Sequence, residues 1–530
     1  MKKILILAFT IVSIIANSQT PFNKFLFDNE IINLDTIKKR MAESEFAHVG
    51  HTPTYSPGLS GYALDLTDDV GERLPLFLDK SEIPAYNKDF AISIWVKTKI
   101  NAHQGTPIMS NKKNGERTSA GWTIGTATNG AWFFNISDGK NTYNYEPTPQ
   151  RQAINDGAWH HIALSIDMKN KEMWMYYDGR NVAIYNIESI TDSIESELQT
   201  VIGGTDEYND WGSRGEWTAF NGMIDEVEIY NTTISAKKVQ ETYQRFFPDG
   251  ATKTPRTPQK LKIQTWNIWH GGRRYGEHVG VARTIDVIKG ENADVVGLIE
   301  TYGSGAIIAD SLDYYFYLIS SNLSIMSRYP IENTVKVFKS FFSGGAVIDL
   351  GHGNKIAFFD IWLNYSPDMC GLFAGASVLP DFLEKEKLTR QKEIKTILSE
   401  IDSYIKNSDK VPVFVAGDFN CGSHLDWTEK AKDQFHGLVV DWQTSRMMIN
   451  AGFKDSFREI NPNGLRDPGF TWSPLINNAS PNQNCIRDRI DFIYYKGKKI
   501  LPYRSRVLEN HAKLWPSDHA TVISSFYTNW

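Results

Sequence analysis

The stretch Val411-Pro-Val-Phe-Val-Ala-Gly-Asp-Phe-Asn420 places a run of apolar residues directly before an acid and an amide. A strand that is apolar on both faces is typical of a buried sheet covered by helices, as in layered α/β domains. Asp418 follows this run at once, and a buried carboxylate is costly unless other groups satisfy it. The stretch therefore predicts an α/β fold and marks the end of this strand as a candidate site.

The same pattern returns at four other places in the second half of the chain. Apolar runs carry or adjoin polar residues at Thr265-Trp-Asn267, Val295-Val-Gly-Leu-Ile-Glu300, Arg489-Ile-Asp-Phe-Ile-Tyr494 and Ser517-Asp-His519. Capping or hydrogen bonding explains each residue alone, but the ordered set favours one site where several strand ends converge. Helical spacing over Val281–Gly290 and Leu383–Asn407 completes the α/β pattern.

These motifs, in this order, resemble the endonuclease/exonuclease/phosphatase superfamily, over residues 259–530. The resemblance implies a four-layered α/β sandwich that hydrolyses phosphoesters with a divalent cation, Mg²⁺ or alternatively Mn²⁺, between two sheet edges. Such hydrolysis needs neutralised phosphoryl charge, a positioned water and help for the leaving oxygen. The resemblance therefore predicts an enzyme, a metal-dependent phosphoric ester hydrolase.

The resemblance also implies a metal side of the site. Glu300 is its principal ligand, Asn267 sits beside Glu300, and Asp518 completes this side. Because Mg²⁺ prefers oxygen ligands and keeps several waters, one carboxylate with a neutral amide is an adequate set. Apurinic nucleases of the family place an acid two residues after the first Asn, where this chain has Trp269, and sphingomyelinase-like members can lack that acid.

By the same resemblance, four residues are catalytic. Asp418 orients or deprotonates the attacking water, and Asn420 hydrogen-bonds a phosphoryl oxygen. His519 contacts the phosphate or acts as an acid or base, while Asp491 fixes its tautomer and raises its basicity.

Five further residues near these motifs are candidate substrate contacts: His270, Arg273, Asn364, Tyr365 and His424. Arginine suits bidentate phosphate contact, but a solvated loop is the alternative for residues 270–274. The family commonly carries a phosphate-binding His on a middle strand, where this chain has Trp362. Asn364 or Tyr365 would then substitute for that His.

The first half of the chain reads as short alternating strands separated by Gly, Asn and Asp turns, which predicts an all-β sandwich. One segment, Lys237–Phe246, has helical spacing after Ser235 as an N-cap. Residues 22–247 resemble the laminin-G/concanavalin-like lectin sandwich in Phe90-Ala-Ile-Ser-Ile-Trp-Val96, Trp159-His-His-Ile-Ala163 and Asn221-Gly-Met-Ile-Asp-Glu-Val-Glu-Ile-Tyr230. Such modules often bind glycans or proteins, and some hold Ca²⁺, so a glycan or surface ligand is the expected partner.

Two groups of residues in this half have competing interpretations. A sugar-stacking platform is one interpretation of four tryptophans, although core positions are favoured for them: Trp122, Trp132, Trp211 and Trp217. Asp225 and Glu226 are candidate Ca²⁺ ligands, with a solvated turn as the alternative. We expect no catalysis from this half.

The composition limits the class of protein. With 530 residues, 41% of them hydrophobic and 12% aromatic, the chain suits two large domains or three smaller ones and is not disordered, collagenous or coiled-coil. The segment Pro248–Pro258 holds three prolines and is a predicted linker. From Pro258 onward there are 31 Lys and Arg and 30 Asp and Glu, a net charge of +1. Because the whole chain has a net charge of −6, the residues before Pro258 have a net charge of −7. The second half therefore has no general basic surface for nucleic acid.

The amino terminus has the pattern of an export signal. Lys2 and Lys3 precede the apolar run Ile4–Ile15, and small residues follow, so residues 1–18 are a predicted signal peptide. The run is short for a membrane span, so the mature chain is expected in the periplasm or secreted, without a transmembrane segment. At most one disulfide can form among the three cysteines, Cys370, Cys421 and Cys485.

Three functions stay open at this point. The favoured one is an exported phosphoesterase that hydrolyses a phosphodiester in a phospholipid head group or a phosphorylated glycan, because a near-neutral domain is joined to a lectin-like module. An extracellular Mg²⁺-dependent nuclease is the alternative, and it would need a local basic patch. The third is a glycan-binding protein with a weakened catalytic domain, which the nearly complete motif set disfavours.

Overall fold

The computed structural model describes residues 19–28, 53–68, 73–100, 106–113, 115–206, 219–250, 255–374, 379–476 and 485–530. The predicted signal peptide, Trp211 and Trp217 lie outside these ranges. Within them, no helix has both the length and the apolar character that a membrane span requires.

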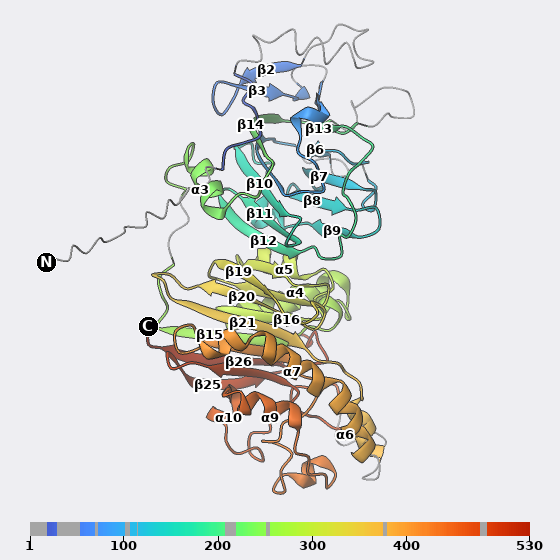
Figure 1. Cartoon of the computed structure of the whole chain (residues 1–530), viewed down its shortest axis with the longest axis vertical. Helices are drawn as coiled ribbons and strands as arrows, with labels where there is room; N and C mark the ends of the chain where they lie inside the picture. Colours follow the sequence, from blue (N-terminus) through green and yellow to red (C-terminus); the bar gives the residue numbers. More distant parts are fainter. Residues whose placement is uncertain are drawn as a thin grey trace, which may run out of the picture.

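The first half is a sandwich of two antiparallel sheets, as predicted (Figure 1). One sheet contains β1 (Asn23–Phe25), β2 (Thr54–Pro57), β3 (Tyr62–Asp65), β14 (Met223–Tyr230), β5 (Phe90–Lys97), β10 (His160–Asp167), β11 (Glu172–Tyr177) and β12 (Arg180–Asn186). The other runs in the order β4 (Leu76–Leu78), β13 (Thr200–Ile202), β6 (Pro107–Ser110), β7 (Gly121–Thr126), β8 (Trp132–Ser137) and β9 (Thr142–Tyr145). Apolar side chains from both sheets fill the space between them.

Burial decides between the competing interpretations in this sandwich. Trp122 and Trp132 are buried in the core, so the core interpretation is confirmed for these two. The solvated-turn alternative for Asp225 and Glu226 is wrong, because both side chains are buried within β14. A register shift after Asp225 lets its carboxylate accept hydrogen bonds from the backbone N–H groups of Leu59 and Ser60.

The predicted helix after Ser235 is confirmed as α3 (Ala236–Gln244). The Ser235 hydroxyl accepts a hydrogen bond from the Lys238 backbone N–H, which satisfies one of the free donors at the helix start.

The second half has the predicted four layers, with two sheets packed face to face and helices outside each. The first sheet runs in the order β17 (Tyr315–Leu318), β18 (Leu323–Ser327), β16 (Val295–Ile299), β15 (Lys260–Asn267), β26 (Thr521–Thr528) and β25 (Ile500–Leu508). The second runs in the order β19 (Ile331–Lys336), β20 (Ser343–Asp349), β21 (Lys355–Trp362), β22 (Val413–Asp418), β24 (Asp491–Lys496) and β23 (Lys454–Asp455).

The outer layers are helical. Helices α4 (Glu277–Glu291) and α5 (Gly305–Ser311) cover the first sheet, and α6 (Leu379–Leu388), α7 (Arg390–Glu400), α8 (Asp402–Lys406) and α9 (Gln443–Asn450) lie beside the second (Figure 1). The single helix predicted over Leu383–Asn407 is therefore broken into α6, α7 and α8. The first break, at Thr389, precedes Arg390, whose buried guanidinium donates to the Pro367 carbonyl.

The two halves share a sheet. Strand β12 of the sandwich pairs in parallel with β17, with Ile184 opposite Tyr317 and Tyr185 opposite Leu318. A 14-stranded sheet therefore runs from one half into the other, and the residues of the sandwich core and of the α4–α5 layer form one apolar cluster. The halves are thus in direct contact as well as being joined by the predicted linker.

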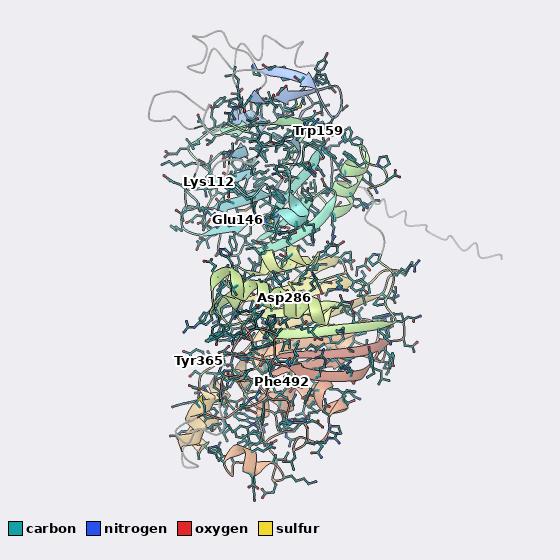
Figure 2. The ribbon with its side chains drawn as sticks, turned by 180° about the vertical axis from the view of Figure 1, so that it is seen from behind. Lys112, Glu146, Trp159, Asp286, Tyr365 and Phe492 are labelled. Carbon is teal, nitrogen blue, oxygen red and sulfur yellow. A yellow bond between two sulfur atoms is a disulfide. The ribbon has the colours of Figure 1, made fainter. Side chains whose placement is uncertain are left out.

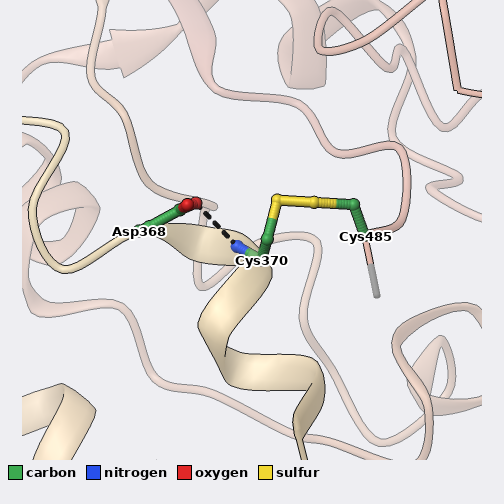
Figure 3. The surroundings of a disulfide bond; sticks show 3 residues. All are labelled: Asp368, Cys370 and Cys485. Atoms are coloured by element: carbon green, nitrogen blue, oxygen red, sulfur yellow. Dashed lines mark hydrogen bonds between the residues drawn. A yellow bond between two sulfur atoms is a disulfide. The ribbon is translucent and has the colours of Figure 1, made fainter. Parts of the chain in front are cut away.

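A disulfide closes the region beside the second sheet. Cys370, in the 3-10 helix η6 (Met369–Ala374), bonds Cys485, which precedes β24 (Figure 3). The Cys370 backbone N–H also donates to Asp368, while Cys421 is a buried free thiol.

Candidate active site

The predicted site residues lie where strands of the two facing sheets end. Parallel strands β15 and β16 bring Asn267 opposite Ile299, next to Glu300. In the other sheet Asp418 ends β22 and faces Asp491, the first residue of the antiparallel β24. His519 precedes β26. All five polar side chains therefore lie at one edge of the four-layered second half.

Hydrogen bonds join these side chains into one buried cluster. The Asn267 amide donates from Nδ2 to Asp418 Oδ2 at 3.1 Å and to Glu300 Oε1 at 3.2 Å, and thereby links the two sheets. His519 Nδ1 lies 2.9 Å from Asp491 Oδ2, and its Nε2 lies 3.8 Å from Asp418 Oδ2. The histidine is thus held between two carboxylates.

Burial and neighbouring charge shift the pKa values here. Burial, reinforced by the charge of Asp491, raises the pKa of Asp418 to about 7. Burial alone would lower the pKa of His519, but the negative charges of Asp491 and Asp418 outweigh it and raise that pKa above its ordinary value. The two carboxylates therefore favour the protonated form of His519, and burial favours the neutral form of Asp418.

The donor set fits a hard divalent cation. Asp491 Oδ1 and Asp518 Oδ1 are buried and make no hydrogen bond to any residue that the structure describes. Burial raises the pKa of Asp518, and the nearby charge of Glu300 adds to the shift. One ligand atom each from Asp418, Asp491 and His519 lie within 4.8 Å of one another. Buried carboxylate oxygens without donors are the ligands that Mg²⁺ or Mn²⁺ prefers.

The structure places Asn420 beside this cluster through its backbone. Its φ is +51°, and its N–H donates to Asp418 Oδ1, which fixes one oxygen of that carboxylate. The Asn420 amide donates from Nδ2 to the Leu363 carbonyl at 2.8 Å, so Asn420 connects β22 with the end of β21.

The five candidate substrate contacts lie in three different settings. His270 stacks on Tyr302 and donates its backbone N–H to Glu300 Oε2 at 3.0 Å, which places it next to the metal side. Arg273 donates to the Tyr302 carbonyl at 2.6 Å. His424 has Nδ1 2.6 Å from the Ser445 hydroxyl, in a loop before α9.

The other two candidates follow β21. Asn364 accepts a hydrogen bond from the Ser366 backbone N–H, and Tyr365 is 63% exposed. Trp362 lies opposite Asp418 in the β-ladder and packs against Phe341, Phe342 and Tyr365. An aromatic wall, composed of Phe341, Phe342, Trp362 and Tyr365, therefore lies beside Asp418, at the position where the family commonly carries a histidine.

Sequence reasoning missed three residues that hold the site in place. Asn322 accepts the Glu300 backbone N–H, Thr471 accepts the Asp491 backbone N–H, and the Ser517 hydroxyl donates to the Asn267 carbonyl. A weak signal existed for Asn322, because it follows Ser320-Ser321 in a turn before an apolar strand. The sequence around Thr471 gave no signal of this role.

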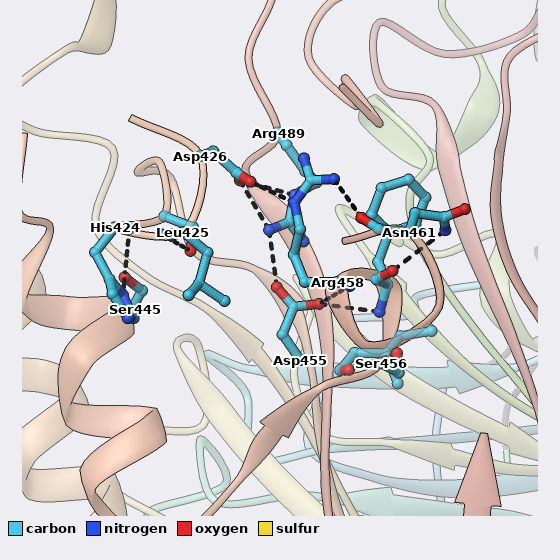
Figure 4. A network of polar contacts seen from close by, with 12 residues as sticks. His424, Leu425, Asp426, Ser445, Asp455, Ser456, Arg458, Asn461 and Arg489 are labelled. Carbon is cyan, nitrogen blue, oxygen red and sulfur yellow. Dashed lines mark hydrogen bonds and ion pairs between the residues drawn. The ribbon is translucent and has the colours of Figure 1, made fainter. Parts of the chain in front are cut away.

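A network of buried charges lies next to the start of β24 (Figure 4). The Arg489 guanidinium lies 2.8 Å from both Asp426 and Asp455, and Arg458 pairs with Asp426 at 2.5 Å. These cations neutralise their carboxylates, so this network is a structural support and differs from the cluster of acids around His519.

Sequence comparison agrees with this geometry. The family model described as "Endonuclease/Exonuclease/phosphatase family" matches residues 265–519, which contain every proposed catalytic and metal-side residue. The second half of the chain belongs to this family. The protein is therefore a metal-dependent phosphoester hydrolase.

The model described as "Concanavalin A-like lectin/glucanases superfamily" matches residues 77–240, within the sandwich.

Similar proteins come from several organisms. Uncharacterized protein F14F9.5 of Caenorhabditis elegans is 31% identical over 300 residues, which cover 51% of this chain and 92% of that protein. A truncated Caenorhabditis elegans TDP2 structure is 16% identical, covers 51% of this chain and 98% of its own, and has a TM-score of 0.36. An AP endonuclease from Archaeoglobus fulgidus is 15% identical, covers 50% and 98%, and has a TM-score of 0.35.

Proposed function

We propose that the protein is an exported phosphodiesterase that uses Mg²⁺ or Mn²⁺. The observation that carries this proposal is the buried cluster in which His519 lies between Asp491 and Asp418 while the carboxylates of Asp491 and Asp518 retain free oxygens. The predicted signal peptide supports export, and so does the Cys370–Cys485 disulfide, because disulfides persist in oxidising compartments.

The residues divide the chemistry between two sides of the cluster. Glu300, Asn267 and Asp518 would hold the cation, which supplies charge neutralisation at the phosphoryl oxygens when bound. Asp418, with its pKa raised to about 7, accepts the proton of the attacking water near neutral pH. Nδ1 of His519 is hydrogen-bonded to Asp491. The other ring nitrogen, Nε2, therefore points its N–H to the substrate and donates a hydrogen bond to a phosphoryl oxygen.

The surroundings favour a substrate with one phosphodiester next to an apolar or planar group. The second half carries a charge of +1, which offers little to a long polyanion. The aromatic wall beside Asp418 includes Phe341 and Tyr365, which are 38% and 63% exposed. The low net charge favours a phospholipid head group or a phosphorylated glycan over a long nucleic acid, and the exposed rings can contact the group attached to the phosphate.

A substrate panel tests this function. Purified full-length protein is assayed on bis-p-nitrophenyl phosphate, p-nitrophenyl phosphate, sphingomyelin vesicles, DNA and RNA, each with Mg²⁺ or EDTA. We expect metal-dependent turnover of diesters, and faster turnover of the lipid than of DNA. Metal-independent turnover would contradict the mechanism, while preferential cleavage of DNA or RNA would establish the nuclease alternative.

A matched pair of variants assigns that activity to the site. Glu300→Gln removes the proposed principal ligand, whereas Glu429→Gln changes an exposed carboxylate that pairs with Lys432. We expect loss of turnover in the first variant alone. Equal turnover in both would show that Glu300 is not a ligand.

We also propose that the sandwich binds a glycan in a cavity of about 360 Å³ on the outer face of β7 and β8. The Phe133 ring packs against Gly125 there, and Asn135 Oδ1 is buried without a hydrogen bond to any described residue. Lys112 and Glu146 lie on the same side of the sandwich (Figure 2). An aromatic ring beside amide and charged groups suits a sugar ring with its hydroxyls.

A glycan array of neutral and acidic oligosaccharides tests this site, with and without Ca²⁺. Phe133→Ala is expected to abolish the binding of wild-type protein, whereas Phe22→Ala, which changes an exposed ring elsewhere, retains it. Binding that survives Phe133→Ala would place the glycan outside this cavity, and a requirement for Ca²⁺ would show that a cation takes part in glycan binding.

A further inference from the structure

The contact between the two halves is built like a protein interior. Asp310 of α5 is 4% exposed, and its carboxylate accepts hydrogen bonds from Thr148 and Gln152 of the sandwich. Arg151 of the sandwich lies 3.3 Å from the same carboxylate. A buried carboxylate that depends on partners from the other half requires that the two halves keep a fixed arrangement.

Strand β12 extends this contact toward the active site. Tyr185 is the last residue of β12 that pairs with β17, and the buried side chain of the next residue, Asn186, donates from Nδ2 to the Ile319 carbonyl at 3.0 Å. Ile319 begins a tight turn, residues 319–323, in which its N–H donates to the Leu323 carbonyl. The sandwich therefore holds the first residue of this turn.

The same turn holds the proposed metal ligand. Asn322, which is fully buried, accepts the Glu300 N–H at Oδ1 (3.1 Å) and the Thr301 N–H at its carbonyl (3.1 Å), and Ser321 accepts the Tyr302 N–H at 2.8 Å. Glu300 has a φ of +57°, a conformation that residues other than glycine rarely adopt. Such a conformation persists when its surroundings hold it, so the turn fixes the backbone of Glu300.

We infer that the sandwich is a positioning part of the active site: through Asn186 it holds the turn 319–323, and through Asn322 this turn sets Glu300 for cation binding. The inference rests on the proposed role of Glu300 as a ligand. Asn186 and Asn322 are positioning residues, because neither touches the reacting atoms. The sandwich then has two tasks, the binding of its own ligand and the support of catalysis in the other half.

Mg²⁺ titrations of the full-length protein test this inference. Asn322→Ala is expected to weaken Mg²⁺ binding by calorimetry about 10-fold, as the loss of an outer-shell partner does. Asn186→Ala is expected to weaken it about 3-fold, within the usual range for residues that couple two sites. In both variants saturating Mg²⁺ is expected to restore kcat, which a damaged fold would not allow.

The control is Asn181→Ala, in the same strand. Its amide donates to the Met175 and Ala183 carbonyls inside the sandwich, so the variant loses buried hydrogen bonds without touching the turn. We expect Asn181→Ala to lower the melting temperature as Asn186→Ala does and to leave Mg²⁺ affinity unchanged. Equal Mg²⁺ affinity in wild type, Asn186→Ala and Asn181→Ala would overturn the inference.

Different results would contradict the positioning role of the sandwich and the proposed role of Glu300 as a ligand. If Glu300→Gln binds Mg²⁺ as tightly as the wild type does, the proposed ligand is wrong, and the inference falls with it. If Glu300→Gln loses Mg²⁺ binding while Asn186→Ala and Asn322→Ala retain it in full, the proposed ligand stands and the positioning role alone is wrong.

Discussion

The two halves of the molecule bury acids in different ways. In the sandwich, Asp225 accepts hydrogen bonds from three backbone N–H groups, those of Leu59, Ser60 and Glu226, so local donors satisfy it. In the second half, Asp491 and Asp518 keep buried oxygens that receive no hydrogen bond from described residues. Because Asp491 and Asp518 lie together at the strand ends, a bound cation would complete both carboxylates, so these acids suit a ligand site.

A similar difference exists within the second half. Asp426 and Asp455 are as deeply buried as Asp418, but Arg489 and Arg458 neutralise them. Around His519 there are more acidic than basic side chains, so this cluster has an excess of negative charge that a metal ion would neutralise. In these two clusters, the compensated charges support the fold, and the uncompensated charges lie at the proposed reactive centre.

The largest effect is expected from the centre itself. His519→Gln removes the imidazole held between Asp491 and Asp418, and we expect kcat on bis-p-nitrophenyl phosphate to fall about 10²–10⁴-fold. The matched control is His511→Gln, which changes a histidine 3.7 Å from Asp286, away from the cluster. A kcat of His519→Gln within tenfold of the control would remove His519 from the mechanism.

The compensated network is expected to affect stability. Arg489→Met leaves Asp426 and Asp455 buried without their shared cation, which costs about 3–5 kcal/mol in the free energy of unfolding. Urea unfolding followed by tryptophan fluorescence measures this loss. Arg446→Met breaks an exposed pair with Asp441 and should cost about 0–1 kcal/mol. Similar losses in both variants would show that burial does not distinguish the two pairs.

The disulfide gives a third, smaller test on stability. It closes a loop of 115 residues around β22, so its loss in Cys370→Ser is expected to cost about 2–4 kcal/mol. Reducing agent should destabilise the wild type to the level of this variant and leave the variant itself unchanged. A variant that reducing agent still destabilises would point to another disulfide.

The strand-end residues of the site could be predicted because their signal is local. Asn267, Glu300 and Asp418 each end or directly follow an apolar run, and the order of these motifs was enough to place them together. Asn322 and Asn186 could not be predicted in the same way, because their role depends on a turn and on the pairing of β12 with β17. Two strands from different halves carry no pattern that predicts such pairing.

The errors in the fold have the same origin. The helical spacing over residues 383–407 is real, but the burial of Arg390 against loop carbonyls interrupts the helix at Thr389. The acids at Asp225 and Glu226 resemble a turn in sequence, whereas a register shift in β14 buries them. Tertiary contacts decided both cases, and these contacts are not visible in a short window of sequence.

The smallest expected effect tests whether the sandwich can lose stability without loss of catalysis. Ser235→Ala removes the hydroxyl that caps α3 and should lower the free energy of unfolding by about 1 kcal/mol. Although α3 contacts β12, the hydrogen bond from Asn186 to the Ile319 carbonyl does not involve α3, so kcat and Mg²⁺ affinity should equal those of the wild type. Urea unfolding and Mg²⁺ calorimetry measure both quantities. A loss of Mg²⁺ affinity in Ser235→Ala would mean that general softening of the sandwich, rather than the Asn186 contact, weakens the active site.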